Sequence, residues 1–280
     1  MSQIEIKKIV EAVNASDGAG VKLKRSIGTP KIDYVDPFLM LDEFGSDNKE
    51  DYVAGFPPHP HRGIETVTYM LHGKFEHEDS TGSKGEMEPG DVQWMKTGRG
   101  IIHSEMPAMS GGKLLGFQLW INMPAKLKKN KPEYVYIKSN ELGTFNDNEK
   151  SIKIIAGQFK NIKGPQTEHN VEPIYFHIVL NKEKEFNFDV PLSHNSFIYL
   201  LKGELKIGTK EHIKTKNSNL ILLEKGNKLL IRANEKSEFL FIAGKPIGEP
   251  IARGGPFVMN TKAEILEAIK DYNNGTFAKY

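Results

Sequence analysis

The chain has 280 residues, of which 38% are hydrophobic and 26% are charged, a mixture typical of globular proteins. Lys and Arg number 38 and Asp and Glu number 36, so the formal charge of +2 argues against a direct nucleic-acid-binding function, which would need a concentrated basic excess. The absence of cysteine excludes disulfide scaffolds, Cys-ligated zinc, iron–sulfur clusters and thiol catalysis.

Nothing in the sequence indicates a membrane or a secretory route. No apolar run approaches the roughly 20 residues that a membrane-spanning helix needs. The first residues alternate charged and apolar side chains and lack the apolar stretch of a signal peptide. We therefore expect a soluble, intracellular protein that does not bind a membrane.

Short stretches of alternating apolar and polar residues, bounded by Gly, Asn, Asp and Pro, predict β-strands along most of the chain. The clearest are Ile64–Leu71, Ile174–Leu180, Phe197–Ile207 and Phe239–Ala243. One helix is expected near the end of the chain, where Thr261 and Glu264 have the spacing of a capping box and Gly275 supplies the stop. Its apolar stripe, expected to pack on a sheet, consists of Ile265, Leu266, Ile269 and Tyr272. The predicted fold class is all-β with a short C-terminal helix.

An internal repeat indicates two copies of one β-domain. Tyr69–Phe75 (YMLHGKF) matches Tyr199–Leu205 (YLLKGEL) 130 residues later, an offset near half the chain length. The alternative is a chance similarity between two hairpins. The polar, basic segment Ala125–Pro132 (AKLKKNKP) is the predicted linker, with a solvated connector as its expected role. The predicted domains are therefore residues 1–132 and 133–280.

Two short motifs carry groups that bind metals. His59 and His61 flank a proline, and His103 and Glu105 flank a serine 44 residues later. Side chains two residues apart in an extended chain point to the same face. If the two segments pair or face each other, three imidazoles and one carboxylate therefore converge on one point.

This donor set suits iron(II), manganese, nickel, copper or zinc, and not calcium. Octahedral coordination by four protein ligands leaves two positions open, for a substrate oxygen and dioxygen. A tetrahedral structural zinc would use all four ligands. The sequence alone leaves both geometries open.

Glu65 is the alternative carboxylate, because it lies four residues beyond His61 and shares its parity in a continuous strand. We expect Glu105 to bind the metal directly, and Glu65 to lie in the shell of residues that hold the ligands in position. The remaining histidines have no second ligand at this spacing and are predicted to be core or surface residues: His72, His77, His169, His177, His194 and His212.

The histidine motifs resemble the two cupin motifs, and several longer segments resemble the pirin family over nearly the whole chain. The segments are Pro37–Gly45 (PFLMLDEFG), Phe56–Glu65 (FPPHPHRGIE), Gly90–Pro107 (GDVQWMKTGRGIIHSEMP) and Arg253–Thr261 (RGGPFVMNT). The resemblance implies a bicupin, that is, two antiparallel β-barrel domains with a metal only in the first. The implied metal is usually iron, Fe(2+), and the implied ligands are His59, His61, His103 and Glu105.

The repeat agrees with a metal only in the first domain. Shifting the four ligand positions by 130 residues lands on Asp189, Pro191, Ala233 and Glu235, none of which is a histidine. The second domain is therefore predicted to be degenerate and metal-free.

The resemblance implies an enzyme as the first of two functions. Some pirins resemble quercetin 2,3-dioxygenases, which open the flavonol ring with O2 and release carbon monoxide. This predicts an iron-dependent dioxygenase that acts on a small aromatic polyphenol. Glu105 would be the general base, and Phe38, Phe56 and Trp120 are candidate pocket walls.

The alternative function is regulatory. Other pirins, mainly eukaryotic, are metal-dependent transcriptional co-regulators in the nucleus. This predicts a non-enzymatic, redox-sensitive iron protein that docks a protein partner. A different cupin oxidation, of another enol or of a thiol, is a third alternative. We expect a monomer located in the cytoplasm, and in the nucleus as well if the source is eukaryotic.

Overall fold

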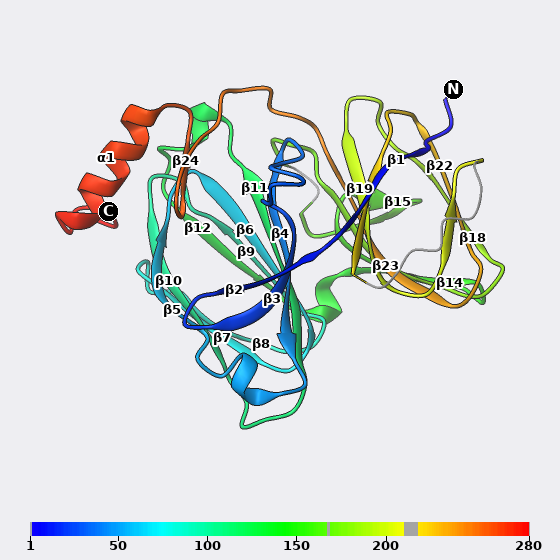
Figure 1. Cartoon of the computed structure of the whole chain (residues 1–280), viewed down its shortest axis with the longest axis horizontal. Coiled ribbons are helices and arrows are strands. Elements are labelled where there is room, and N and C mark those ends of the chain that lie inside the picture. The colour runs from blue at the N-terminus through cyan, green and yellow to red at the C-terminus, as the bar shows by residue number, and fades with distance from the viewer. Residues whose placement is uncertain (1, 167–168, 210–217, 280) are drawn as a thin grey trace. The chain divides into compact units, whose positions relative to one another are not determined.

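The computed structural model describes residues 2–166, 169–209 and 218–279 (Figure 1); His212 lies outside them. Antiparallel strands dominate these ranges, and their one α-helix is α1 (Lys262–Asn273) near the C-terminus. The predicted all-β fold class with a C-terminal helix is confirmed. The chain forms two compact units, which we call unit 1 (residues 1–13, 30–37 and 141–246) and unit 2 (residues 14–29, 38–140 and 247–280).

Unit 2 contains two antiparallel sheets. The larger has the strand order β12-β9-β6-β11-β4-β3-β2 and the smaller the order β5-β10-β7-β8. Their strands are β2 (Val13–Asp17), β3 (Val21–Ile27), β4 (Phe38–Ser46), β5 (Phe56–His61), β6 (Ile64–His72), β7 (Phe75–Asp79), β8 (Lys84–Met87), β9 (Val92–Lys96), β10 (Ile101–Pro107), β11 (Leu114–Asn122) and β12 (Glu133–Ile137). A hairpin, β24 (Ala252–Gly254) and β25 (Phe257–Met259), and short 3-10 helices at Lys49–Asp51 and Ala125–Leu127 complete it.

Unit 1 repeats this plan. Its larger sheet has the order β1-β21-β19-β23-β17-β14-β13 and a smaller one the order β18-β22-β20. The strands are β1 (Ile6–Glu11), β13 (Gly143–Asn146), β14 (Lys150–Ala156), β15 (Gln158–Phe159), β16 (Ile162–Lys163), β17 (Ile174–Leu180), β18 (Glu185–Asp189), β19 (Asn195–Lys202), β20 (Leu205–Ile207), β21 (Asn219–Leu223), β22 (Lys228–Ala233) and β23 (Ser237–Gly244). A third 3-10 helix spans Ser139–Glu141. The interior of unit 1 is an apolar cluster rich in phenylalanine.

The units are discontinuous because the chain ends pair with distant strands. β1 pairs with β21 in unit 1. In unit 2, the backbone N–H of Val258 donates to the carbonyl of Arg62 at 3.0 Å. Gly63 permits this approach, because a Cβ atom there would lie 2.1 Å from the Val258 carbonyl oxygen. The single domain boundary at residues 132 and 133 stays a prediction.

The four predicted strands are present, and one of them is interrupted. Residues 197–207 form β19 and β20 with a tight turn between them. Gly203 in this turn has φ +98°, and a Cβ atom there would lie 2.3 Å from the Ser237 hydroxyl. The alternating pattern therefore continued across a turn that leads from one sheet of unit 1 to the other, and Gly203 was the sequence signal for this turn.

Most of the predicted linker is exposed as expected, including Lys126, Lys129 and Lys131, but the expectation of a solvated side chain is wrong for Lys128. Its side chain is 1% exposed. Its ammonium donates to the carbonyls of Gly63 and Val258 and to the Asn122 side chain at 2.7–2.8 Å. Three acceptors compensate much of the cost of burying the charge. Lys128 thus ties three separate segments of unit 2 together.

Helix α1 begins as expected and packs differently. Thr261 and Glu264 form a complete capping box. Of the predicted apolar stripe, Ile265 is buried, whereas Leu266 is 67% exposed. Ala268 is the second buried residue of the helix, so the contact face is narrower than the sequence pattern predicted.

Candidate metal centre

Strands β5 and β10 bring the three predicted histidines together. The strands pair antiparallel, with His59 opposite His103 and His61 opposite Ile101. The ring centroids of His59 and His103 lie 4.3 Å apart, and those of His61 and His103 lie 5.1 Å apart. Each ring offers a nitrogen, and these three ligand atoms all lie within 4.8 Å of one another.

One nitrogen of each ring is held by a neighbour in this unit. Nδ1 of His59 lies 2.8 Å from the Pro57 carbonyl oxygen, and Nδ1 of His61 lies 3.2 Å from that of Pro256. A carbonyl only accepts, so Nδ1 carries the proton in both rings and Nε2 keeps its lone pair. Ligating histidines in metal sites are held in this way.

His103 has a buried nitrogen that a metal ion would satisfy. It is 1% exposed, and its Nε2 is buried without a hydrogen-bond partner among the described residues. A buried polar atom left unpaired costs free energy unless something binds it. A metal ion between the three Nε2 atoms would remove that cost.

Burial also keeps the cluster in the form that binds metals. It lowers the pKa of His61 to about 3, assisted by the charge that His59 would carry. Burial lowers the pKa of His103 well below its usual value, with further contributions from the neighbouring rings. Both imidazoles are therefore neutral near pH 7 and available as ligands.

Glu105 lies near these rings on β10 and is 1% exposed. Its Oε1 accepts hydrogen bonds from the hydroxyl of Thr68 at 2.9 Å and from the amide of Gln93 at 3.0 Å, and Oε2 accepts one from the amide of Gln118 at 3.1 Å. All three donors are neutral, and no cationic side chain of the described residues pairs with this carboxylate. A buried anion without a cation favours a site for a positive ion.

Glu105 is not a member of the set of atoms within 4.8 Å of one another, which comprises the three histidines. Its place as a fourth ligand therefore stays a prediction. The alternative carboxylate, Glu65, is buried on β6 and accepts a hydrogen bond from the indole N–H of Trp94 at 2.6 Å.

His77 and Asp79 belong to the surroundings of this centre, and the sequence analysis missed them. Nδ1 of His77 lies 3.4 Å from Nδ1 of His103, and Nε2 of His77 lies 3.0 Å from Oδ2 of Asp79. If Nε2–H of His77 donates a hydrogen bond to Asp79, then Nδ1 of His77 accepts one from Nδ1–H of His103, and Nε2 of His103 keeps its lone pair for a metal. His77 and Asp79 are two residues apart, so the spacing rule applied to His59 and His61 would have found them.

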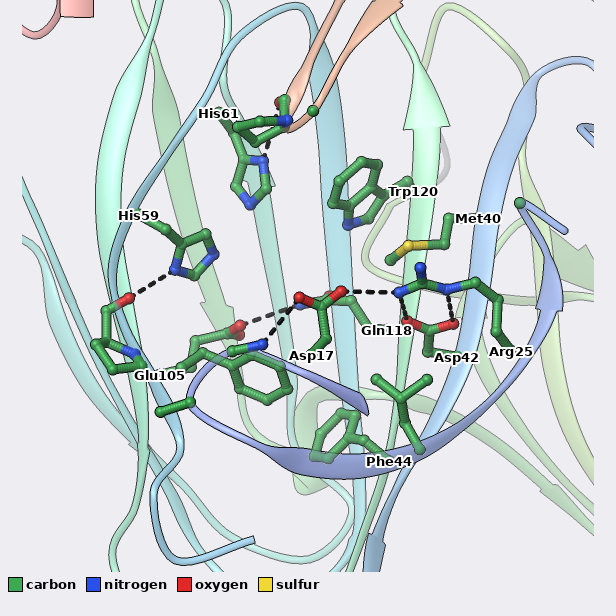
Figure 2. Close-up of a pocket in the computed structure, with 18 of the residues that line it drawn as sticks. Asp17, Arg25, Met40, Asp42, Phe44, His59, His61, Glu105, Gln118 and Trp120 are labelled. Carbon is green, nitrogen blue, oxygen red and sulfur yellow. Dashed lines mark hydrogen bonds and ion pairs between the residues drawn. The ribbon is translucent and has the colours of Figure 1, made fainter. Parts of the chain in front are cut away.

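A pocket of about 670 Å³ opens onto the histidines (Figure 2). His59, His61 and Glu105 line one part of it. Phe56 and Trp120 line it as expected, and the Trp120 ring meets that of His61 edge-on at 5.0 Å. Further walls come from Leu23, Met40, Phe44, Pro256 and Val258. Phe38 is fully buried and does not line the pocket, so this expectation is wrong.

Comparison with protein families identifies the chain. The Pirin family model matches residues 20–121, and the model of the Pirin C-terminal cupin domain matches residues 175–278. The chain belongs to the pirin family.

Relatives of this pirin include a pirin-like protein of Caulobacter vibrioides, 39% identical over 97% of this chain and 98% of the relative. Human pirin is 38% identical over 92% of this chain and 89% of its own. The crystal structure of quercetin 2,3-dioxygenase from Acinetobacter baumannii superposes with a TM-score of 0.89 and 29% identity, over 99% of each chain. Both domains of this family member are thus cupins, as the sequence resemblance predicted. Its described residues contain no helix long and apolar enough to span a membrane.

Proposed function

We propose that this pirin is an iron(II)-dependent dioxygenase that opens a flavonol such as quercetin with O2 and releases carbon monoxide. The observation that carries the proposal is the pocket of about 670 Å³ with His59 and His61 in its wall, since these two histidines form one cluster with the buried His103. Its volume is suited to a small aromatic molecule. The similarity to a structure named quercetin 2,3-dioxygenase supports the same reaction class.

The proposed ligands are Nε2 of His59, His61 and His103 together with the carboxylate of Glu105. Iron(II) in this position would supply a Lewis acid for a substrate oxygen and open positions for two small ligands. The protein residues bind and orient the ring. Trp120, Phe56 and Phe44 provide flat apolar surfaces around the pocket, which would exclude water from the bound substrate.

Glu105 is the proposed acceptor of the substrate hydroxyl proton. Its Oε2 accepts a single hydrogen bond, from Gln118, whereas Oε1 accepts two. A free lone pair therefore remains on Oε2, and the pocket is lined by this residue. The proton would rest on Oε2 while Gln93 and Thr68 hold the carboxylate in place.

The test is aerobic turnover by iron-loaded protein. Oxygen consumption, loss of the flavonol absorbance and release of carbon monoxide are expected with quercetin, and none above background with His61→Ala. Tight binding of iron without turnover of quercetin would overturn the enzymatic proposal. It would favour the regulatory alternative, in which capture of a protein partner depends on the oxidation state of the metal.

Two matched variants test the carboxylate. Glu105→Gln is expected to weaken iron binding by about 10- to 100-fold and to abolish turnover. Glu65→Gln is expected to keep the metal content and to lower stability through the weakened bond from Trp94. Full iron retention in Glu105→Gln would exclude it as a ligand.

We further propose that the protein acts as a monomer in the cytoplasm, and also in the nucleus if its source is eukaryotic. Light scattering coupled to size-exclusion chromatography, at the concentration used for turnover, gives the mass that tests the first statement.

A further inference from the structure

Three charged residues form a second polar region of the pocket: Asp17, Arg25 and Asp42. They come from the adjacent strands β2, β3 and β4. Figure 2 shows Arg25 and Asp42 on one side of the pocket and His59 on the other, with Asp17 between them. A ligand bound at the histidines would therefore extend toward this group.

Arg25 is held rigidly. Its Nε and Nη2 donate to the two carboxylate oxygens of Asp42 at 2.9 and 2.7 Å, and Nη2 also donates to Oδ2 of Asp17 at 2.9 Å. Arg25 and Asp42 are direct cross-strand partners. Such a two-point contact fixes the plane of a guanidinium.

One nitrogen of this guanidinium is unused. Nη1 of Arg25 makes no hydrogen bond to a described residue, and Figure 2 shows it directed toward the space beside Met40. This region of the pocket therefore presents a fixed N–H donor. Asp17, whose side chain is 55% exposed, presents carboxylate oxygens as acceptors nearby.

The charge of the group opposes an anion. Within this group two carboxylates face one guanidinium, and Arg253, the other guanidinium of the pocket lining, donates to the Leu39 carbonyl at 3.3 Å. Partial burial acts to raise the pKa of Asp17, but hydrogen bonds from Arg25 and the Gly18 backbone outweigh it and lower the pKa, so Asp17 is ionised near pH 7. A hydroxyl group can use the Arg25 donor and the Asp17 acceptor together, whereas a carboxylate or sulfonate would meet net repulsion.

On the basis of the proposed function, we propose that Asp17 and Arg25 form a subsite for the hydroxylated ring of the substrate that is remote from the metal. The subsite selects a neutral phenolic ring and rejects an anionic one. Asp42 acts as a positioning residue, since it holds the guanidinium that contacts the ligand.

The test measures binding to iron-loaded protein under argon, where no turnover occurs, by isothermal titration calorimetry. Three ligands differ only in this ring: quercetin with two hydroxyls, galangin with none, and quercetin sulfonated on the same ring. Wild-type protein is expected to bind quercetin roughly tenfold more tightly than either of the others, the factor that one or two hydrogen bonds to a charged group provide.

Two variants dissect the subsite. Arg25→Lys removes the free Nη1 and is expected to abolish the preference of quercetin over galangin. Asp17→Asn removes the charge and is expected to bring the sulfonated ligand to within about threefold of quercetin. Lys24→Gln is the matched control, because Lys24 is the neighbour of Arg25 on β3, pairs with Glu43 and does not line the pocket; it should keep both ratios.

Equal affinity of wild-type protein for quercetin and galangin would overturn the proposal. So would ratios that Asp17→Asn, folded as judged by its thermal melt, leaves unchanged. Failure of the proposed function looks different, because the ligand preferences would then be present while quercetin is not consumed in air.

Discussion

The two units share a sheet plan and differ in what the smaller sheet presents. In unit 2, β5 and β10 carry His59, His61, His103 and Glu105. In unit 1, the strands at the same places in the plan are β18 and β22, and they carry Phe186, Phe188, Leu229 and Ile231, with Phe186 opposite Ile231 and Phe188 opposite Leu229.

The difference shows that the same arrangement of sheets can form around apolar side chains or around polar ones. Unit 1 packs phenylalanine rings here, for example Phe159 against Phe186 at 5.7 Å and Phe188 against Phe241 at 5.8 Å, and its pocket of about 530 Å³ beside Phe159 and Phe188 has no histidine among the described residues that line it. Unit 2 leaves a pocket of about 670 Å³ and buries polar rings instead. Apolar side chains are therefore sufficient to hold the two sheets of a unit together. The imidazoles of unit 2 contribute less apolar packing than the phenylalanines of unit 1, but they provide a binding site.

The largest expected effect is the loss of metal from unit 2. His61→Ala removes one of three converging nitrogens, and we expect iron affinity to fall by more than about 100-fold. Elemental analysis after desalting measures this. The matched control is His177→Ala in unit 1, which should retain wild-type metal content. Equal metal in the two variants would contradict the assignment of the site to unit 2.

The packing of unit 1 gives the second effect. Phe186→Ala removes a fully buried ring from the core, so the free energy of unfolding is expected to fall by about 3–5 kcal/mol. Met40→Ala in the pocket wall of unit 2 enlarges an existing space and is expected to cost about 1–2 kcal/mol. Urea denaturation compares them, and equal losses would show that the pocket walls are as tightly packed as the core.

Acid should destabilise the metal-free protein through the buried imidazoles. The pKa of His61 is about 3 in the folded chain and about 6.5 when unfolded. Between these values the unfolded chain binds more protons, so stability falls as pH decreases below about 6.5. From pH 7 to pH 5 this residue alone accounts for about 2 kcal/mol.

Denaturant titrations at the two pH values, after removal of metal by a chelator, measure this loss. His61→Gln cannot take up the proton and should show a correspondingly smaller loss. The same acid sensitivity in both proteins would assign the effect to other groups.

The smallest expected effect concerns Asp79 and His77, which orient His103 without binding the metal. Asp79→Asn replaces the charged acceptor that orients His77, and through it His103, by a neutral amide, so iron affinity is expected to fall by about tenfold. Competition with a chromogenic chelator measures it. Glu78→Gln, a change in the exposed neighbour, is the control and should bind iron as the wild type does.

Short-range patterns in the sequence predicted much of this structure. Alternation located β6, β17 and β23, the capping box located the start of α1, and spacing of two within each motif brought three histidines to one point. These features depend on neighbours a few residues apart, where backbone geometry alone decides which side chains share a face.

Other features depend on long-range contacts and were missed or misread. The 130-residue shift placed Asp189 on β18 and Ala233 on β22, but it placed Pro191 and Glu235 just beyond the ends of these strands. Lys128 was predicted to be a solvated linker residue, because two of its three acceptors, Gly63 and Val258, lie far away in the sequence. His77 was dismissed although Asp79 gave it the informative spacing.

The hydrogen bond that the Pro256 carbonyl accepts from Nδ1–H of His61 has a consequence for biosynthesis. The two residues are 195 positions apart, so every residue between them must be translated before this hydrogen bond can form. A nascent chain that ends before Pro256 would contain all three imidazoles but would lack the hydrogen-bond acceptor of His61. Wild-type iron affinity is therefore expected only after Pro256 has been synthesised and has folded against His61.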